Sequence, residues 1–166
     1  QRFLDRLCED SSLEPYLQIM DRLRLRTSAR NQLLARVRRI QPDGLHDRIQ
    51  LQLPGADQQL CALITHASTE RLNLNVGDGV FALVKASWVR LLATDAARPA
   101  TDDNLLTGQI RQLEQGELDS EMHIELPGGT LLTAMLSNAQ LTARPLTVGE
   151  SVCLQIDAKQ IILCSL

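Results

Sequence analysis

The sequence has little aromatic content and no excess of positive charge. Phe, Tyr and Trp together make up 2% of the 166 residues, so few side chains could stack on nucleic acid bases. Seventeen Lys and Arg stand against 20 Asp and Glu, and the formal net charge of −3 argues against a general electrostatic attraction to phosphates. A nucleic-acid-binding function of these residues is therefore disfavoured, and the core is expected to be aliphatic.

Long apolar runs and metal-binding motifs are also missing. No run approaches the roughly 20 residues of a membrane span, and the first residues lack the apolar stretch of a signal peptide, so we expect a cytoplasmic protein with no membrane partner. The four cysteines form no C-x-x-C pair and no histidine lies at zinc-finger spacing, so we expect buried thiols and no directly bound metal cation. The three histidines are far apart in the sequence, and we do not expect an enzyme.

Residues 1–26 are expected to form a helical lead-in, in which residues 13–25 have the periodicity of a helix. Apolar side chains recur at three- and four-residue spacing from Leu13 to Leu23, after Ser12 as a candidate N-cap. We expect a helix over residues 13–25. Since the sequence begins without Met, this helical segment is interpreted as the link to an upstream region of a longer polypeptide.

The rest of the sequence is a tandem repeat. The triplets Leu53-Pro54-Gly55 and Leu126-Pro127-Gly128 align at an offset of 73 residues, and Val76-Gly77 aligns with Val148-Gly149 at an offset of 72. In each copy, short stretches of alternating apolar and polar residues are separated by turn residues, which predicts β-strands. In the first copy the strands are expected at 33–40, 48–53, 59–65, 79–85 and 88–92.

A unit of about 65 residues with five strands favours a small closed barrel of the OB type, because closure removes the exposed sheet edges. The sequence thus predicts a mainly β protein of two tandem OB-like barrels behind a short helical lead-in. The first barrel is expected over residues 27–95 and the second over residues 102–166.

The two copies differ in charge at equivalent positions. Lys85 of the first copy corresponds to Asp157 of the second, and the segment Thr27-Ser28-Ala29-Arg30-Asn31 corresponds to a segment with Asp102 and Asp103. Hydrogen-bond donors in the first copy would form a pocket for a small oxyanion if the fold brings them together: they are Ser28, Arg30, Thr65, Ser68 and Lys85. The alternative is that the hydroxyls cap or end local structure and that Lys85 is a solvated surface charge.

Three features carry a resemblance to a known family. The segment Thr27–Asn31, the Val76-Gly77 turn and the run Val80–Trp88, placed on a tandem repeat, resemble the molybdate-binding Mop (molbindin-like) domains. The resemblance is specifically to the C-terminal di-Mop region of molybdate-dependent transcriptional regulators.

The resemblance implies a homodimer of intertwined barrels that binds molybdate, or tungstate, between subunits. It implies that Ser28 and Arg30 come from one subunit and that Thr65, Ser68, Lys85 and the Ala86 backbone N–H come from the other. The residues assigned to the ion are Ser28, Arg30, Thr65, Ser68, Lys85, Ala86 and Ser87. Trp88 is expected near the site, where its emission would report occupancy.

The second copy, with Gln140 and Asp157, is not expected to form the same site. The family's winged helix-turn-helix has no counterpart in this sequence, so DNA is expected as a partner only through an upstream domain. The predicted function is that of a molybdate-sensing domain.

Alternatives within and beyond the family stay open. They are an intracellular molybdate storage protein, a module of a transporter ATPase and an OB-fold nucleic-acid binder. The ATPase interpretation lacks a P-loop motif in this sequence.

Overall fold

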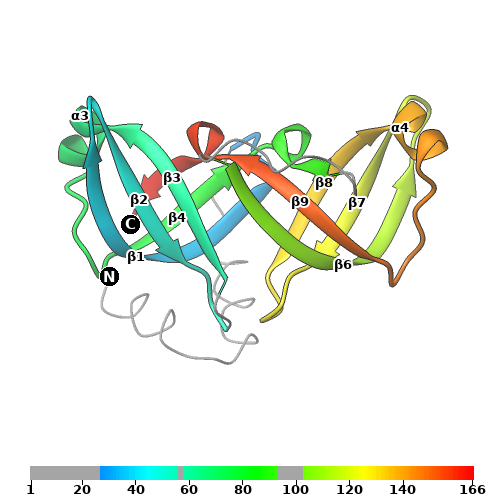
Figure 1. Ribbon diagram of the computed structural model, residues 1–166, viewed down its shortest axis with the longest axis horizontal. Helices are drawn as coiled ribbons and strands as arrows, with labels where there is room; N and C mark the ends of the chain where they lie inside the picture. The colour runs from blue at the N-terminus through cyan, green and yellow to red at the C-terminus, as the bar shows by residue number, and fades with distance from the viewer. Residues whose placement is uncertain (1–26, 56–57, 93–102) are drawn as a thin grey trace.

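The computed structural model describes residues 27–55, 58–92 and 103–166 (Figure 1). The helical lead-in expected over residues 1–26 lies outside the described residues. Within the described part of the chain, no helix is long and apolar enough to cross a membrane.

Strands dominate both repeats, as the sequence predicts. The elements of the first repeat are β1 (Asn31–Asp43), β2 (His46–Gln52), β3 (Gln59–Thr65), α3 (His66–Arg71), β4 (Gly79–Val84), η1 (Ala86–Trp88) and β5 (Arg90–Leu92). Those of the second are β6 (Asp103–Gln115), β7 (Asp119–Glu125), β8 (Leu131–Ser137), α4 (Asn138–Ala143), β9 (Ser151–Asp157), η2 (Ala158–Gln160) and β10 (Ile162–Ser165). The mainly β fold with tandem OB-like barrels is therefore confirmed.

The last strand of each repeat belongs to the sheet of the other repeat. The two five-stranded antiparallel sheets have the orders β10-β4-β1-β2-β3 and β5-β9-β6-β7-β8. In register, Ile162 of β10 pairs with Leu83 of β4, and Leu91 of β5 pairs with Leu154 of β9. β10 also contacts β3, and β5 contacts β8, so each sheet curls round into a barrel.

This exchange corrects one expectation. A strand over residues 88–92 within the first barrel is wrong, because the 3₁₀ turn of η1 carries the chain to the other repeat, where only Arg90–Leu92 pairs, with β9. The division into barrels at 27–95 and 102–166 remains a prediction about the repeats, because each repeat contributes its last strand to the sheet of the other.

A strand-and-bulge pattern repeats in both halves and shapes the barrels. β1 and β6 are both 13 residues long, and each has a register shift at the equivalent place, between Val37 and Arg39 in β1 and between Ile110 and Gln112 in β6. Such bulges bend a strand, which lets one long strand serve both halves of a small barrel.

The core is aliphatic and continuous across the repeats. β2 alternates partly exposed and buried residues, and Ile49 and Leu51 are fully buried. Buried side chains of both repeats form one cluster, which joins Val37 and Ala82 of the first repeat with Ile110 of the second. Separating the repeats would therefore expose apolar surface as well as sheet edges.

Candidate functional site

Two cations of the first repeat lie at neighbouring strand ends. Asn31, the first residue of β1, is the register partner of Val84, the last residue of β4. The next residues outward, Arg30 and Lys85, are therefore opposite one another at the same end of the sheet. Both side chains are exposed, and the small residues beside them, Ala29 and Ala86, are buried. A pair of cations is thus presented at the surface on a buried backbone support.

Lys85 lies over an aromatic ring. Its Nζ is 5.1 Å from the centroid of the Trp88 ring, which is a cation–π distance. Both residues belong to the short 3₁₀ segment, in which Lys85 is the N-cap residue, Ala86 is the first residue and Ser87 is exposed. Among the described residues, no carboxylate forms an ion pair with Lys85. Its charge is therefore available to a ligand.

The second repeat has the opposite charges at the same place. Asp103 and Asp157, which correspond to Arg30 and Lys85, are register partners at the equivalent ends of β6 and β9. Asp157 also accepts a hydrogen bond from the backbone N–H of Lys159 at 2.9 Å and so caps η2. An anion that would be attracted by the first repeat would be repelled at this position of the second.

Thr65 and Ser68 lie at the other end of the first barrel. Thr65 pairs with His46, which pairs in turn with Asp43 at the far end of β1 from Asn31. Figure 1 shows α3, which contains Ser68, at the outer end of the molecule, whereas η1, drawn in green, is near the middle. One chain therefore does not bring Thr65 and Ser68 to Lys85. The expectation that these three residues come to the ion from the same subunit needs revision.

The two hydroxyls of that outer end are close together. Thr65 caps α3 by accepting a hydrogen bond from the Ser68 N–H at 3.1 Å, and the two hydroxyl oxygens are 2.8 Å apart. They line a groove of about 400 Å³ between β3 and β10. Lys159, from the second repeat, lines the same groove with Arg71. The sequence analysis assigned neither Lys159 nor Arg71 to the site. Lys159 and Lys85 are the two lysines of the sequence.

His66 and Asp47 anchor the same short helix. His66 Nδ1 is 2.9 Å from the Asp47 carboxylate, which is 2% exposed, and its Nε2 is 3.1 Å from Glu70. The Asp47 hydrogen bond and charge raise the pKa of His66 above its ordinary value. Burial raises the pKa of Asp47, but hydrogen bonds from Thr69 and His66 outweigh burial and lower it overall.

In the second repeat the equivalent pair is neutral. Ser120 and Asn138 stand in place of Asp47 and His66, and the Ser120 hydroxyl donates to Asn138 Oδ1 at 2.6 Å. The same anchor is thus ionisable in one repeat and neutral in the other.

Arg30 is held by a carboxylate of the other repeat. Both terminal nitrogens of its guanidinium donate to Glu121 on β7, one to Oε1 and the other to Oε2 at 3.2 Å. The hydrogen bond with Glu121 raises the pKa of Arg30, and the same bond lowers the pKa of Glu121. Sequence reasoning missed Glu121 because this contact joins distant parts of the chain. A signal was present, since the equivalents of Arg30 and Glu121 are Asp103 and Arg48, a pair of reversed charge.

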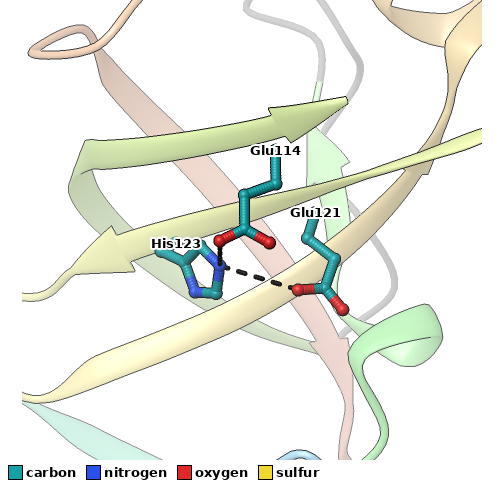
Figure 2. A group of neighbouring side chains, drawn as sticks. All are labelled: Glu114, Glu121 and His123. Atoms are coloured by element: carbon teal, nitrogen blue, oxygen red, sulfur yellow. Dashed lines mark ion pairs between the residues drawn. The ribbon is translucent and has the colours of Figure 1, made fainter. Parts of the chain in front are cut away.

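Glu121 belongs to a cluster of three ionisable side chains (Figure 2). His123 Nε2 is 3.6 Å from Glu121 and 3.8 Å from Glu114, and this nitrogen is buried without a hydrogen-bond partner. Such groups can bind a divalent cation. Because Arg30 already contacts both oxygens of Glu121, the cluster acts here as the counter-charge of the guanidinium.

Comparison with known proteins identifies the family. Residues 27–91 and 100–163 match the TOBE domain, once for each repeat, and the chain belongs to the TOBE-domain family.

Transcriptional regulators match this chain over its whole length. It is 35% identical over 167 residues to the transcriptional regulator ModE of Yersinia pestis and 31% identical over 168 residues to the DNA-binding transcriptional dual regulator ModE of Escherichia coli K12. Both alignments cover 100% of this chain, which spans 63% of the length of either relative. The resemblance to molybdate-dependent regulators is confirmed.

A solved structure shares the tandem architecture. The cytoplasmic molybdate-binding protein ModG, crystallised with molybdate bound, superposes with a TM-score of 0.79 at 30% identity. The match covers 86% of this chain and 100% of ModG. The pairing of two barrels within one chain is thus shared with a protein that binds this oxyanion.

Proposed function

We propose that this chain is the molybdate-sensing part of a molybdate-responsive transcriptional regulator. The observation that carries the proposal is the position of Arg30 and Lys85 directly beyond the register pair Asn31–Val84, where the second repeat has Asp103 in register with Asp157. The first repeat has two cations at this end of the sheet, and the sequence of the second repeat has two acids at the equivalent positions. This difference fits one oxyanion site per chain, built by the first repeat.

The donors at this end suit a tetrahedral dianion. Arg30 offers a planar fork of N–H groups, Lys85 a point charge, and Ser28 and Ser87 offer hydroxyls. Ala86, as the first residue of a 3₁₀ turn, has a backbone N–H without an acceptor in that turn. A fully ionised oxyanion needs only donors, whereas a protonated phosphate also needs an acceptor for its O–H. We therefore expect molybdate, with tungstate as a substitute, to bind in preference to phosphate.

The remaining donors call for a second copy of the chain. Thr65 and Ser68 lie at the far end of the barrel, so in this proposal they reach the ion from the partner of a homodimer. This revises the division of ligands between the subunits: Ser28, Arg30, Lys85, Ala86 and Ser87 would come from one and the two outer hydroxyls from the other.

An ion held by two chains favours one arrangement of the dimer. The ion can change the activity of an attached DNA-binding domain only if it binds one arrangement of the dimer more tightly than the other. In this proposal the chain works in the cytoplasm, as ModG does, and reaches DNA only through an upstream domain.

A storage function is the second candidate. It is favoured by the similarity to ModG, a cytoplasmic molybdate-binding protein. Stoichiometry separates the two, because a sensor with one site in the first repeat binds one ion per chain. A ratio well above one would favour storage.

Titration of Trp88 emission with molybdate tests the site. We expect Arg30→Ala to weaken binding by roughly 10- to 100-fold, since a charge-assisted hydrogen bond contributes about 1.5–3 kcal/mol. Arg111→Ala is the matched control, because Arg111 is a second-repeat arginine paired with Glu125. Lys85→Ala requires calorimetry, since losing the Lys85–Trp88 contact alters the emission directly. Unchanged affinity in Arg30→Ala would contradict the proposal.

A further inference from the structure

The guanidinium assigned to the oxyanion already has an anionic partner. Glu121 presents its two oxygens to the two terminal nitrogens of Arg30. This is the bidentate arrangement in which a guanidinium also receives an oxyanion, so the carboxylate and the ion compete for the same donors.

The partner comes from the repeat that lacks the cation pair. Arg30 precedes β1 of the first repeat, while Glu121 lies on β7 of the second. Lys85, the other proposed cation, has no such partner among the described residues. Occupation by a carboxylate is therefore specific to Arg30, and exchanging that carboxylate for an ion breaks a contact between the repeats.

A histidine beside Glu121 offers its carboxylate another hydrogen-bond partner when the carboxylate leaves Arg30. His123 Nε2 is 3.6 Å from Glu121 Oε2 and has no hydrogen-bond partner (Figure 2). The His123 Nδ1 is 3.3 Å from the Thr133 hydroxyl, which fixes the orientation of the ring. A carboxylate that leaves Arg30 thus faces a donor-capable nitrogen.

We propose that Glu121 is an intramolecular competitor that occupies Arg30 until the oxyanion displaces it, so that the second repeat sets the affinity of the site in the first. This inference rests on the proposed function and adds the residue that tunes it. Because coupling is reciprocal, the ion weakens the Arg30–Glu121 contact by the same factor by which that contact weakens ion binding.

The expected effect is modest in size. The side chains of Arg30 and Glu121 are 47% and 22% exposed, so solvent screens the pair. Removing a competitor of this kind should tighten molybdate binding by about 1.5- to 5-fold.

Calorimetric titration of Glu121→Gln with sodium molybdate tests the proposal. The variant keeps the size of the side chain and removes its charge. Glu125→Gln is the matched control, because Glu125 lies on the same strand, pairs with an arginine and gives the same change in net charge. We expect tighter binding in Glu121→Gln and wild-type affinity in Glu125→Gln.

Measuring the effect of Glu121→Gln in the Arg30→Lys variant as well separates loss of the specific contact from a change in net charge. In Arg30→Lys the two-pronged contact with the carboxylate is lost, so adding Glu121→Gln should bring a smaller gain than it does in the wild type. An equal gain in both backgrounds would overturn the proposal.

The outcomes separate this inference from the proposed function. If the wild type binds molybdate and Glu121→Gln binds it equally or more weakly, the competitor role is wrong while the sensor proposal stands. Equal tightening in Glu121→Gln and Glu125→Gln would also overturn it, as a net-charge effect. If the folded wild type does not bind molybdate, the proposed function fails and this inference fails with it.

Discussion

The side-chain amide of Asn104 lies against the backbone of Cys61 and pairs with it as a neighbouring strand would. The Cys61 N–H donates to Asn104 Oδ1 at 2.7 Å, and Asn104 Nδ2 donates to the Cys61 carbonyl at 2.9 Å. Asn31, at the equivalent position of the first repeat, makes the same two bonds with Thr133 at 2.7 and 2.9 Å. Two asparagines thus join each repeat to the edge strand of the other.

Replacing either asparagine should destabilise the protein. Asn31→Ala and Asn104→Ala each remove two bonds between repeats and leave backbone groups of β8 or β3 without partners. We expect a loss of about 2–4 kcal/mol in the free energy of unfolding. Equilibrium urea unfolding measures it, with Asn75→Ala as the control, since the exposed Asn75 side chain bonds only within its own loop. A loss below about 0.5 kcal/mol in both variants would show that these bonds are not important.

The pair His66–Asp47 should make stability depend on pH. The pKa of His66 is raised, so its contribution is fully present below its ordinary value of 6.5 and is lost as pH rises through the folded-state pKa. The pKa of Asp47 is lowered, so its contribution is present above 3.8 and is lost as pH falls through its folded-state pKa. The pair therefore stabilises the protein most between these two values.

Exchanging this pair for its neutral counterpart tests the pH dependence. The double variant Asp47→Ser, His66→Asn copies the second repeat, where Ser120 and Asn138 form the anchor. Melting temperatures measured on both sides of pH 6.5 should fall with rising pH in the wild type and change less in the variant. Parallel curves for the two proteins would contradict the assignment.

A substitution in the last strand of the second repeat should affect the first repeat. Leu163 on β10 is 7% exposed and pairs with Ala82 on β4, while its neighbour Ile162 is 50% exposed. We expect Leu163→Ser to cost about 2–4 kcal/mol and Ile162→Ser less than about 1 kcal/mol. Hydrogen exchange should show faster opening of β4 in Leu163→Ser. Faster exchange confined to β9 would show that β10 does not stabilise the first sheet.

Much of the fold follows from the sequence because alternation and duplication are local signals. The alternating pattern of residues 48–53 and the repeated turns placed the strands and the two copies. The exchange of β5 and β10 could not be predicted, because the sequence of a three- or four-residue strand does not indicate which sheet the strand joins. Its place depends on the direction in which the turns at Ala86 and Ala158 send the chain.

The position of the cations in the candidate site also has a signal in the sequence. The contrast between Lys85 and Asp157 is visible in the sequence, and the register pair Asn31–Val84 then brings the neighbouring residues Arg30 and Lys85 to the same end of the sheet. Thr65 and Lys85 are separated because the strands that lead to them run antiparallel to each other in the sheet. The spacing of the two residues in the sequence does not reveal those directions. Glu121 was missed because its contact with Arg30 spans 91 positions.

The crossed edge strands also constrain how such a chain can evolve. A deletion of either repeat would leave the survivor with β4 or β9 as an open edge, ready to accept a strand from another molecule. The duplication is therefore difficult to reverse: a halved gene would encode a product that must find a second polypeptide or aggregate. The two halves can differ in charge, as Lys85 and Asp157 do, but they have to be inherited together.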